Sequence, residues 1–203
     1  MNTKDFDLTA LNFFTRAKRE NELKICNEIV ELRRTRETCL ADATLGAMRE
    51  LGIEVTPHDE LKVLKRRKQD FDMWREKTER RIGNDSDLAR LAAFKVDKRF
   101  IKHVVAPHGL QVEEISAADL SDVLRLKQVD QSVLVSMLWE NPHIKGNYAQ
   151  HVVHLTEPKQ LFNDAGVAYK CSDNQVHNPE ALQRGLKKSL DLTGRNGWLL
   201  KRR

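Results

Sequence analysis

The residues best suited to bind a metal ion are three histidines and a cysteine in the C-terminal half. His151, His154, Cys171 and His177 follow the pattern H-x2-H-x16-C-x5-H, and these residue types suit tetrahedral zinc. The pair spacings are not those of a familiar zinc finger, and residues three apart on a strand point to opposite faces. We therefore expect no bound metal, with Cys171 a small buried residue and the histidines near the surface. Zinc remains the alternative.

Residue patterns typical of enzymes are missing from the sequence. The nine glycines are dispersed, and neither a phosphate-binding glycine loop nor a G-x-S-x-G nucleophile elbow occurs. Cys39 and His58 have the residue types of a nucleophile and its base, but no other feature supports that pairing. We expect a non-enzymatic protein with no cofactor.

Two basic stripes are candidates for binding phosphate groups. Three cations, Lys62, Lys65 and Arg66, share one face of an expected helix, and a second stripe on the following helix holds Lys95, Arg99 and Lys102. If the two helices are adjacent, the stripes could merge into one basic groove. The alternative is a pair of solvated faces laced with weak ion pairs, worth roughly 0.2–0.5 kcal/mol each, because acidic residues flank the cations.

The C-terminal segment is the most basic part of the chain. The protein has 35 Lys and Arg against 30 Asp and Glu, a net charge of +5. Residues 181–203 hold seven cations and one acid, a net charge of +6, which leaves −1 for residues 1–180. The sequence therefore predicts a basic C-terminal arm on a nearly neutral body. Its binding residues would be Arg184, Lys187, Lys188, Arg195, Trp198, Lys201, Arg202 and Arg203.

The basic arm has three modes of binding. Trp198 could anchor it on an acidic protein surface, or stack on a base while the cations contact the phosphates of a nucleic acid. The arm could also lie on an anionic membrane, although its apolar face is short for that. Alternatively, Leu182, Leu186 and Leu190 pack on the body and the last ten residues only improve solubility.

Helices are expected to position most of these residues. The N-terminal half predicts helices at 8–18, 21–51, 57–82 and 86–105, with the second and third forming an antiparallel hairpin. Thr56 is the expected N-cap of the third helix, and Pro57 suits its first position. Residues 33–38 contain no apolar side chain, so the second helix should be exposed, interrupted or bound to an acidic group there.

The C-terminal half predicts shorter elements. Helices are expected at 117–126, at 131–140 and from residue 179, and short strands at 148–155 and 167–171. The helix pair in this half suggests a helix-turn-helix, but residues 131–140 contain no Lys or Arg for contacts with bases. We therefore expect an ordinary pair of packed helices.

The expected fold is mainly α. Long antiparallel helices would form the N-terminal half, and a compact helical C-terminal half would hold up to two short strands. The expected regions are a long-helix bundle at 1–106, a compact helical region with at most a short β-hairpin at 107–180, and the basic arm at 181–203.

The expected location is the cytoplasm. No apolar run approaches the roughly 18 residues of a membrane span, the N-terminus lacks a secretory signal pattern, and the three cysteines are scattered.

Two functions follow from the charge pattern. The first is a nucleic-acid-associated accessory or regulatory protein that binds mainly through phosphate contacts. The alternative is a structural or assembly protein, a scaffold or adaptor, that forms a homo-oligomer through its long helices and docks its arm on an acidic partner.

Overall fold

The computed structural model describes residues 3–34, 38–81, 86–128, 130–140, 148–160, 167–171, 176–177 and 179–203. The helices are α1 (Thr3–Arg33), α2 (Cys39–Glu50), α3 (Pro57–Arg81), α4 (Ser86–Val105), the 3-10 helix η1 (Ala106–His108), α5 (Leu120–Arg125) and α6 (Pro179–Thr193). The strands are β1 (Leu110–Ile115), β2 (Gln131–Glu140), β3 (Tyr148–Gln160), β4 (Val167–Cys171), β5 (Val176–His177) and β6 (Gly197–Arg202).

An antiparallel sheet lies at the centre of the fold. In the described part of the chain, four strands pair in the order β1-β6-β2-β3, and β4 and β5 extend the sheet beyond β3. The last strand of the chain, β6, is thus inserted between β1 and β2. The expectation of a mainly α protein is wrong, because this is a mixed α/β fold with a real sheet.

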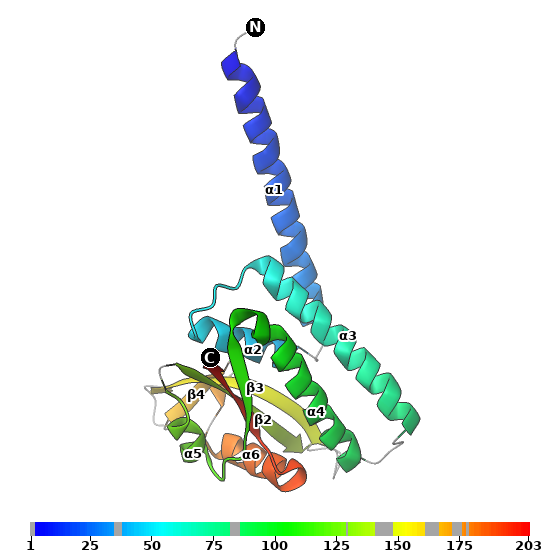
Figure 1. Ribbon diagram of the computed structural model, residues 1–203, viewed down its shortest axis with the longest axis vertical. Helices are drawn as coiled ribbons and strands as arrows, with labels where there is room; N and C mark the ends of the chain where they lie inside the picture. The colour runs from blue at the N-terminus through cyan, green and yellow to red at the C-terminus, as the bar shows by residue number, and fades with distance from the viewer. Residues whose placement is uncertain are drawn as a thin grey trace.

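Helices cover both faces of the sheet (Figure 1). One face packs against α2 and α4, where Leu134, Val152 and Trp198 join a core that also includes residues of α1 and α3. The opposite face packs against α5 and α6 through a second set of apolar residues, which includes Val133 and Val135. Residues on both sides of the expected boundary at residue 106 therefore share one core.

Strand β2 occupies the segment that was expected to be a helix. Its alternate side chains point to opposite faces, and both faces are covered by helices, so residues 132–138 are all buried. A strand buried on both sides has apolar residues in succession instead of an alternating pattern. Leu134, Met137 and Leu138 are therefore spaced as on one face of a helix, which is why the sequence predicted a helix at 131–140.

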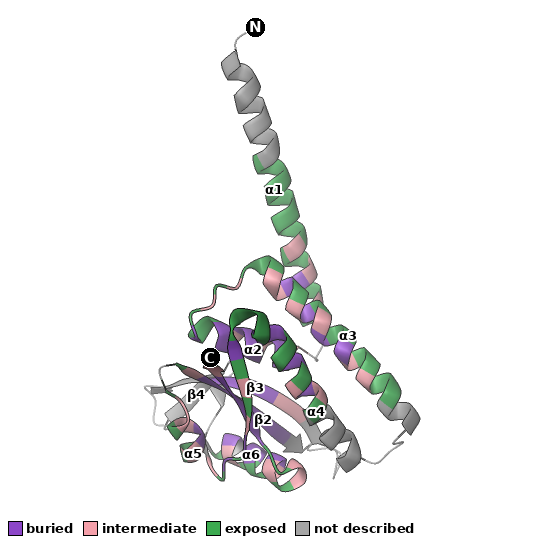
Figure 2. Ribbon diagram, viewed as in Figure 1, coloured by how far each residue is buried: buried purple, intermediate pink, exposed green. Residues whose placement is uncertain are grey.

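The segment expected to be a basic arm is part of the body. Residues 179–193 form α6, whose Leu182 and Leu186 are buried, and residues 197–202 form β6. Gly197 is required for this pairing, because a Cβ atom there would lie 2.3 Å from the Leu134 carbonyl oxygen. Figure 2 shows buried residues along the strands of the sheet. An exposed arm is thus excluded, because its apolar residues complete the core.

Helices α3 and α4 lie close to the predicted positions. The capping residues Thr56 and Pro57 start α3 as expected, and α4 begins at Ser86 and ends in η1. The expected single helix at 21–51 is divided, since α1 ends at Arg33 and α2 begins at Cys39; residues 35–37 lie outside the described residues. Among the described helices, none is long and apolar enough to cross a bilayer.

Candidate anion-binding groove

A groove of about 580 Å³ lies where α2, α3 and the end of α4 meet. Its lining residues are Leu45 and Met48 of α2, Asp59, Lys62, Val63, Lys65, Arg66 and Gln69 of α3, and His103, Val104, Pro107 and His108 of α4 and η1. The floor contributed by α2 is apolar, whereas α3 supplies most of the polar side chains. This arrangement places several cations around a volume large enough for a phosphate-containing group.

Three cations of the groove come from one face of α3. Lys62, Lys65 and Arg66 are spaced at i, i+3 and i+4, so a helix brings them together. Lys65 contacts Glu28 of α1 at 2.6 Å, and Arg66 contacts Asp70 at 3.1 Å. Lys62 is exposed, and its charge helps to lower the pKa of Asp59. The Lys65–Glu28 pair is partly exposed on both sides and therefore weak, so Lys65 can contact an anion. The Asp70 side chain is only 2% exposed, so Arg66 stays bonded through its Nε to a buried carboxylate.

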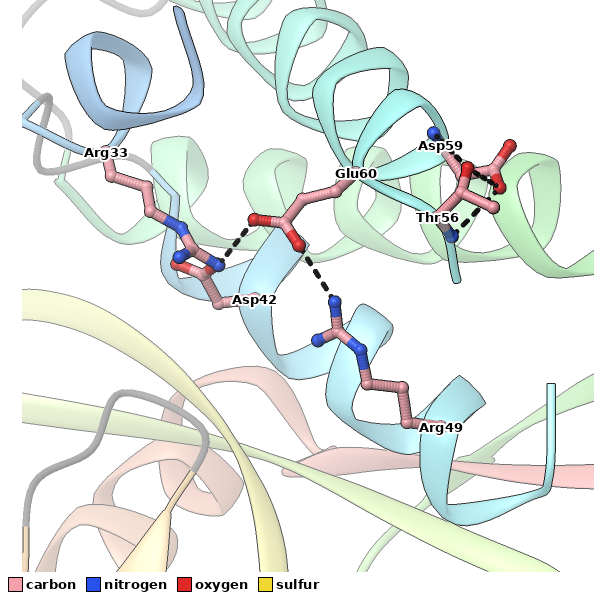
Figure 3. Close-up of polar contacts among 6 residues, drawn as sticks. All are labelled: Arg33, Asp42, Arg49, Thr56, Asp59 and Glu60. Carbon is pink, nitrogen blue, oxygen red and sulfur yellow. Dashed lines mark hydrogen bonds and ion pairs between the residues drawn. The ribbon is translucent and has the colours of Figure 1, made fainter. Parts of the chain in front are cut away.

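Asp59 is the one acidic residue among the described residues that line the groove, and its carboxylate is already engaged. The Thr56 hydroxyl donates to Asp59 Oδ2 at 2.6 Å, and the Thr56 backbone N–H donates to the same oxygen at 3.2 Å (Figure 3). In return, the Asp59 backbone N–H donates to Thr56 Oγ1, which forms a capping box at the start of α3. These hydrogen bonds from Thr56 lower the pKa of Asp59. Asp59 therefore stays ionised, but the three cations of α3 outnumber it in the groove.

A network of ion pairs fixes the N-terminal end of α3 against α1 and α2. Glu60 accepts from Arg33 of α1 at 3.0 Å and from Arg49 of α2 at 2.8 Å (Figure 3). Arg33 also contacts Asp42 at 2.9 Å. Burial raises the pKa of the Asp42 carboxyl, and the Arg33 guanidinium opposes that shift. Arg33 lies in the segment that lacks apolar side chains. It links α1, α2 and α3, and so helps to position α3 as one wall of the groove.

The second basic stripe flanks the groove without lining it. Lys95, Arg99 and Lys102 are exposed on α4. Helix α4 packs beside α3, so the two basic stripes lie on adjacent helices, as a merged groove would require. The α4 residues that reach the groove are His103, one turn after Arg99, and Val104. His103 and His108 were missed as site residues. Their position at the Pro107-His108-Gly109 helix end was the available signal.

Most cations of the predicted C-terminal arm already have partners within the protein. Arg195 contacts Glu114 at 3.3 Å, Lys201 contacts Glu113 at 2.5 Å, and Arg202 donates to the Leu51 carbonyl at 2.6 Å. Arg184 lies 4.0 Å from Glu180, and Lys188 also has an interaction partner. Lys187 and Arg203 are exposed.

Trp198 is fully buried in the core, so it cannot serve as an exposed anchor. The structure thus does not gather the arm's residues into one site.

The two described histidines of the zinc alternative point to opposite faces of the sheet. His151 and His154 both lie on β3, three residues apart, and His154 points toward α2, where its Nε2 lies 2.7 Å from Glu50 Oε2. The side chains of Cys171 and His177 lie outside the described residues. Among the described side chains, no group of three potential ligands comes together.

Glu50 is the centre of a polar cluster between α2 and the sheet. Besides the contact with His154, its carboxylate accepts from Ser132 Oγ at 2.6 Å and from Lys127 Nζ at 2.6 Å. Burial acts to raise the pKa of Glu50, but the hydrogen bonds from His154, Lys127 and Ser132 outweigh it and lower the pKa to about 2. The cluster holds α2 on the sheet and thus supports the floor of the groove.

Glu50→Gln is expected to reduce the stability of the protein at neutral pH by roughly 1–3 kcal/mol, because Lys127 loses its charged acceptor. Glu50 has a lowered pKa, so its contribution is complete above its unfolded value of 4.5 and is lost as the pH falls toward 2. The variant should therefore lose less stability than the wild type between pH 5 and pH 3 in urea denaturation. Glu54→Gln, a nearby exposed residue, is the matched control. Equal pH dependence in both variants would contradict this role of Glu50.

No known protein family matches the chain, and no curated protein is significantly similar to it.

Proposed function

We propose that this protein is a non-enzymatic nucleic-acid-associated accessory or regulatory protein that binds phosphate groups in the groove on α3. The observation that carries the proposal is the set of Lys62, Lys65 and Arg66 in a groove whose one described acid, Asp59, caps its own helix. Exposed Arg99 and Lys102 of α4 extend the positive charge beyond the groove. A flexible polyanion could contact both helices at once.

The proposed contacts are mainly electrostatic and therefore independent of base sequence. Lysine and arginine contacts to phosphate position a protein on nucleic acid, whereas base-edge contacts provide sequence specificity. Strand β2 replaces the helix that a helix-turn-helix would insert into the major groove, so that mode of recognition has no structural support in this chain. A nucleic-acid ligand also fits the proposed cytoplasmic location.

An acidic protein surface is the alternative partner. The version in which a C-terminal arm docks on that surface fails, because residues 197–202 form a central strand. The homo-oligomer expected for an assembly protein has separate support, because α1 projects from the body (Figure 1).

Lys62→Gln is expected to weaken binding to a 20-base-pair DNA duplex of mixed sequence. If Lys62 contacts one phosphate, the slope of log affinity against log salt should fall by about 0.9, the value for one phosphate contact on duplex DNA. Fluorescence anisotropy at several salt concentrations measures both quantities. The charge-matched control is Lys187→Gln on α6, which covers the opposite face of the sheet.

Glu28→Gln provides a variant with the opposite expected effect. It removes the acid that contacts Lys65, so the affinity for the duplex should rise. A purified protein with no salt-dependent binding to DNA or RNA would refute the proposed function. Equal losses from Lys62→Gln and Lys187→Gln would refute the groove as its site. Equal competition by poly-glutamate and by the duplex would favour the acidic protein partner.

A further inference from the structure

Helix α1 projects from the body of the protein (Figure 1). Its 31 residues correspond to about 46 Å of helix at 1.5 Å per residue. Ile25, Ile29 and Leu32 near its C-terminal end pack on the shared core, while residues 15–24 are all exposed (Figure 2). An isolated helical segment has little stability in water, so a second packing surface would stabilise this one.

A second apolar stripe runs along α1 away from the body. Leu23, Cys26 and Val30 are spaced at i, i+3 and i+7, which places them on one face. Leu23 is 63% exposed and Val30 is 51% exposed, and Cys26 is also exposed. This face lies about 115° around the helix from the face of Ile25 and Ile29, because the helix turns 100° per residue. The helix therefore has one apolar face packed on the body and one that faces solvent.

If two copies of α1 pack side by side in opposite directions, the charged residues beside this stripe face residues of opposite charge on the other copy. The flanking row contains Glu20, Lys24, Asn27, Glu31 and Arg34, all of them exposed. In an antiparallel pair of these helices, Glu20 would face Arg34 of the second copy, Lys24 would face its Glu31, and Asn27 would face Asn27.

The ion pairs that these residues already make within one copy are too weak to prevent pairing with a second copy. Arg16 contacts Glu20 at 3.0 Å and Arg34 contacts Glu31 at 2.6 Å, but the side chains of both pairs are more than 60% exposed. Exposed ion pairs of this kind contribute little to stability, so their charges can exchange partners at low cost.

We infer that residues 20–34 of α1 form an antiparallel homodimer, with the two-fold axis close to Asn27. Leu23 of one copy then packs near Val30 of the other, as an isologous interface requires. This self-association does not depend on nucleic-acid binding, so either property can fail while the other holds.

Sedimentation velocity over a concentration series tests the dimer in the full-length protein. The wild type should shift from monomer to dimer as its concentration rises, and Leu23→Glu or Val30→Glu should remain monomeric. Both positions are exposed in the monomer, so the variants should retain the wild-type circular dichroism spectrum. Ala17→Glu is the control, because Ala17 is exposed on another face of α1. A wild type that stays monomeric throughout, or one that Leu23→Glu does not affect, would overturn the inference.

Disulfide formation tests the antiparallel direction. In a chain with Cys26, Cys39 and Cys171 replaced by serine, one variant carries Glu20→Cys and another carries Arg34→Cys. An antiparallel dimer predicts that oxidation of the mixture links the two different chains, and that each variant alone forms little covalent dimer. Covalent dimers of each variant with itself, or no linkage in the mixture, would overturn the proposed arrangement.

Discussion

Trp198→Ala is expected to destabilise the protein by about 3–5 kcal/mol, the usual cost of truncating a buried aromatic side chain. Trp198 is fully buried on β6, where it packs in the core between the sheet and the helices α2 and α4. Deletion of residues 197–203 should have a still larger effect, because it removes the strand that joins β1 to β2. The shortened chain should lack the cooperative unfolding transition of the wild type.

Urea denaturation followed by circular dichroism measures both effects. Trp74→Ala is the matched control, since Trp74 is the same residue type but only partly buried on α3, and its loss should be smaller. A shortened chain that remains folded, or a Trp198→Ala variant within about 1 kcal/mol of the wild type, would show that β6 is an appendage.

Asp97→Ala is expected to cost about 3–5 kcal/mol, because it removes the carboxylate that balances the charge of the buried Arg67 guanidinium. Arg67 on α3 donates to Asp97 on α4 at 2.7 Å, and both side chains are buried. Gln150 on β3 donates to the other Asp97 oxygen at 3.1 Å, so the carboxylate also connects the helices to the sheet. Losing this link would loosen α3 and α4, which form the walls of the groove.

A double variant separates the ion pair from packing. Arg67→Met combined with Asp97→Leu should recover most of the lost stability, since apolar replacements of a buried ion pair are often neutral or stabilising. Asp72→Ala, an exposed acid on α3, is the control for removal of a carboxylate. The assignment fails if Asp97→Ala and Asp72→Ala have the same midpoint of urea denaturation.

Local signals in the sequence were sufficient to place α3 and α4, two of the three helices that form the groove. Thr56, Pro57 and Asp59 define the start of α3 through capping, and Lys62, Lys65 and Arg66 follow on one helical face. These are interactions between residues close in sequence, so a single sequence contains them. The strands β3 and β4 were also located, because their β-branched and aromatic residues are a local signal.

The sheet's central strands could not be identified in the same way. Strand β2 is covered on both faces, and its serines 132 and 136 meet Glu50 and Gln150, which lie far away in sequence. Residues 201–203 are three consecutive cations, a pattern that suggests exposure to solvent. Yet Lys201 of β6 contacts Glu113 on β1, and Arg202 donates to the Leu51 carbonyl just after α2. Pairings between residues this distant in sequence have no local signature. The charge of residues 181–203 therefore predicted an exposed binding arm, whereas the structure has β6 there, a strand of the core.

The most direct test of the groove is lysine footprinting of the full-length protein with and without a DNA duplex. An acetylating reagent modifies exposed amines, and mass spectrometry then reports the modified fraction at each lysine. We predict that the duplex protects Lys62 and Lys65, while the exposed Lys187 on the opposite side of the sheet keeps its reactivity. Unchanged modification of Lys62 and Lys65 in the presence of bound duplex would contradict the groove as the phosphate-binding site.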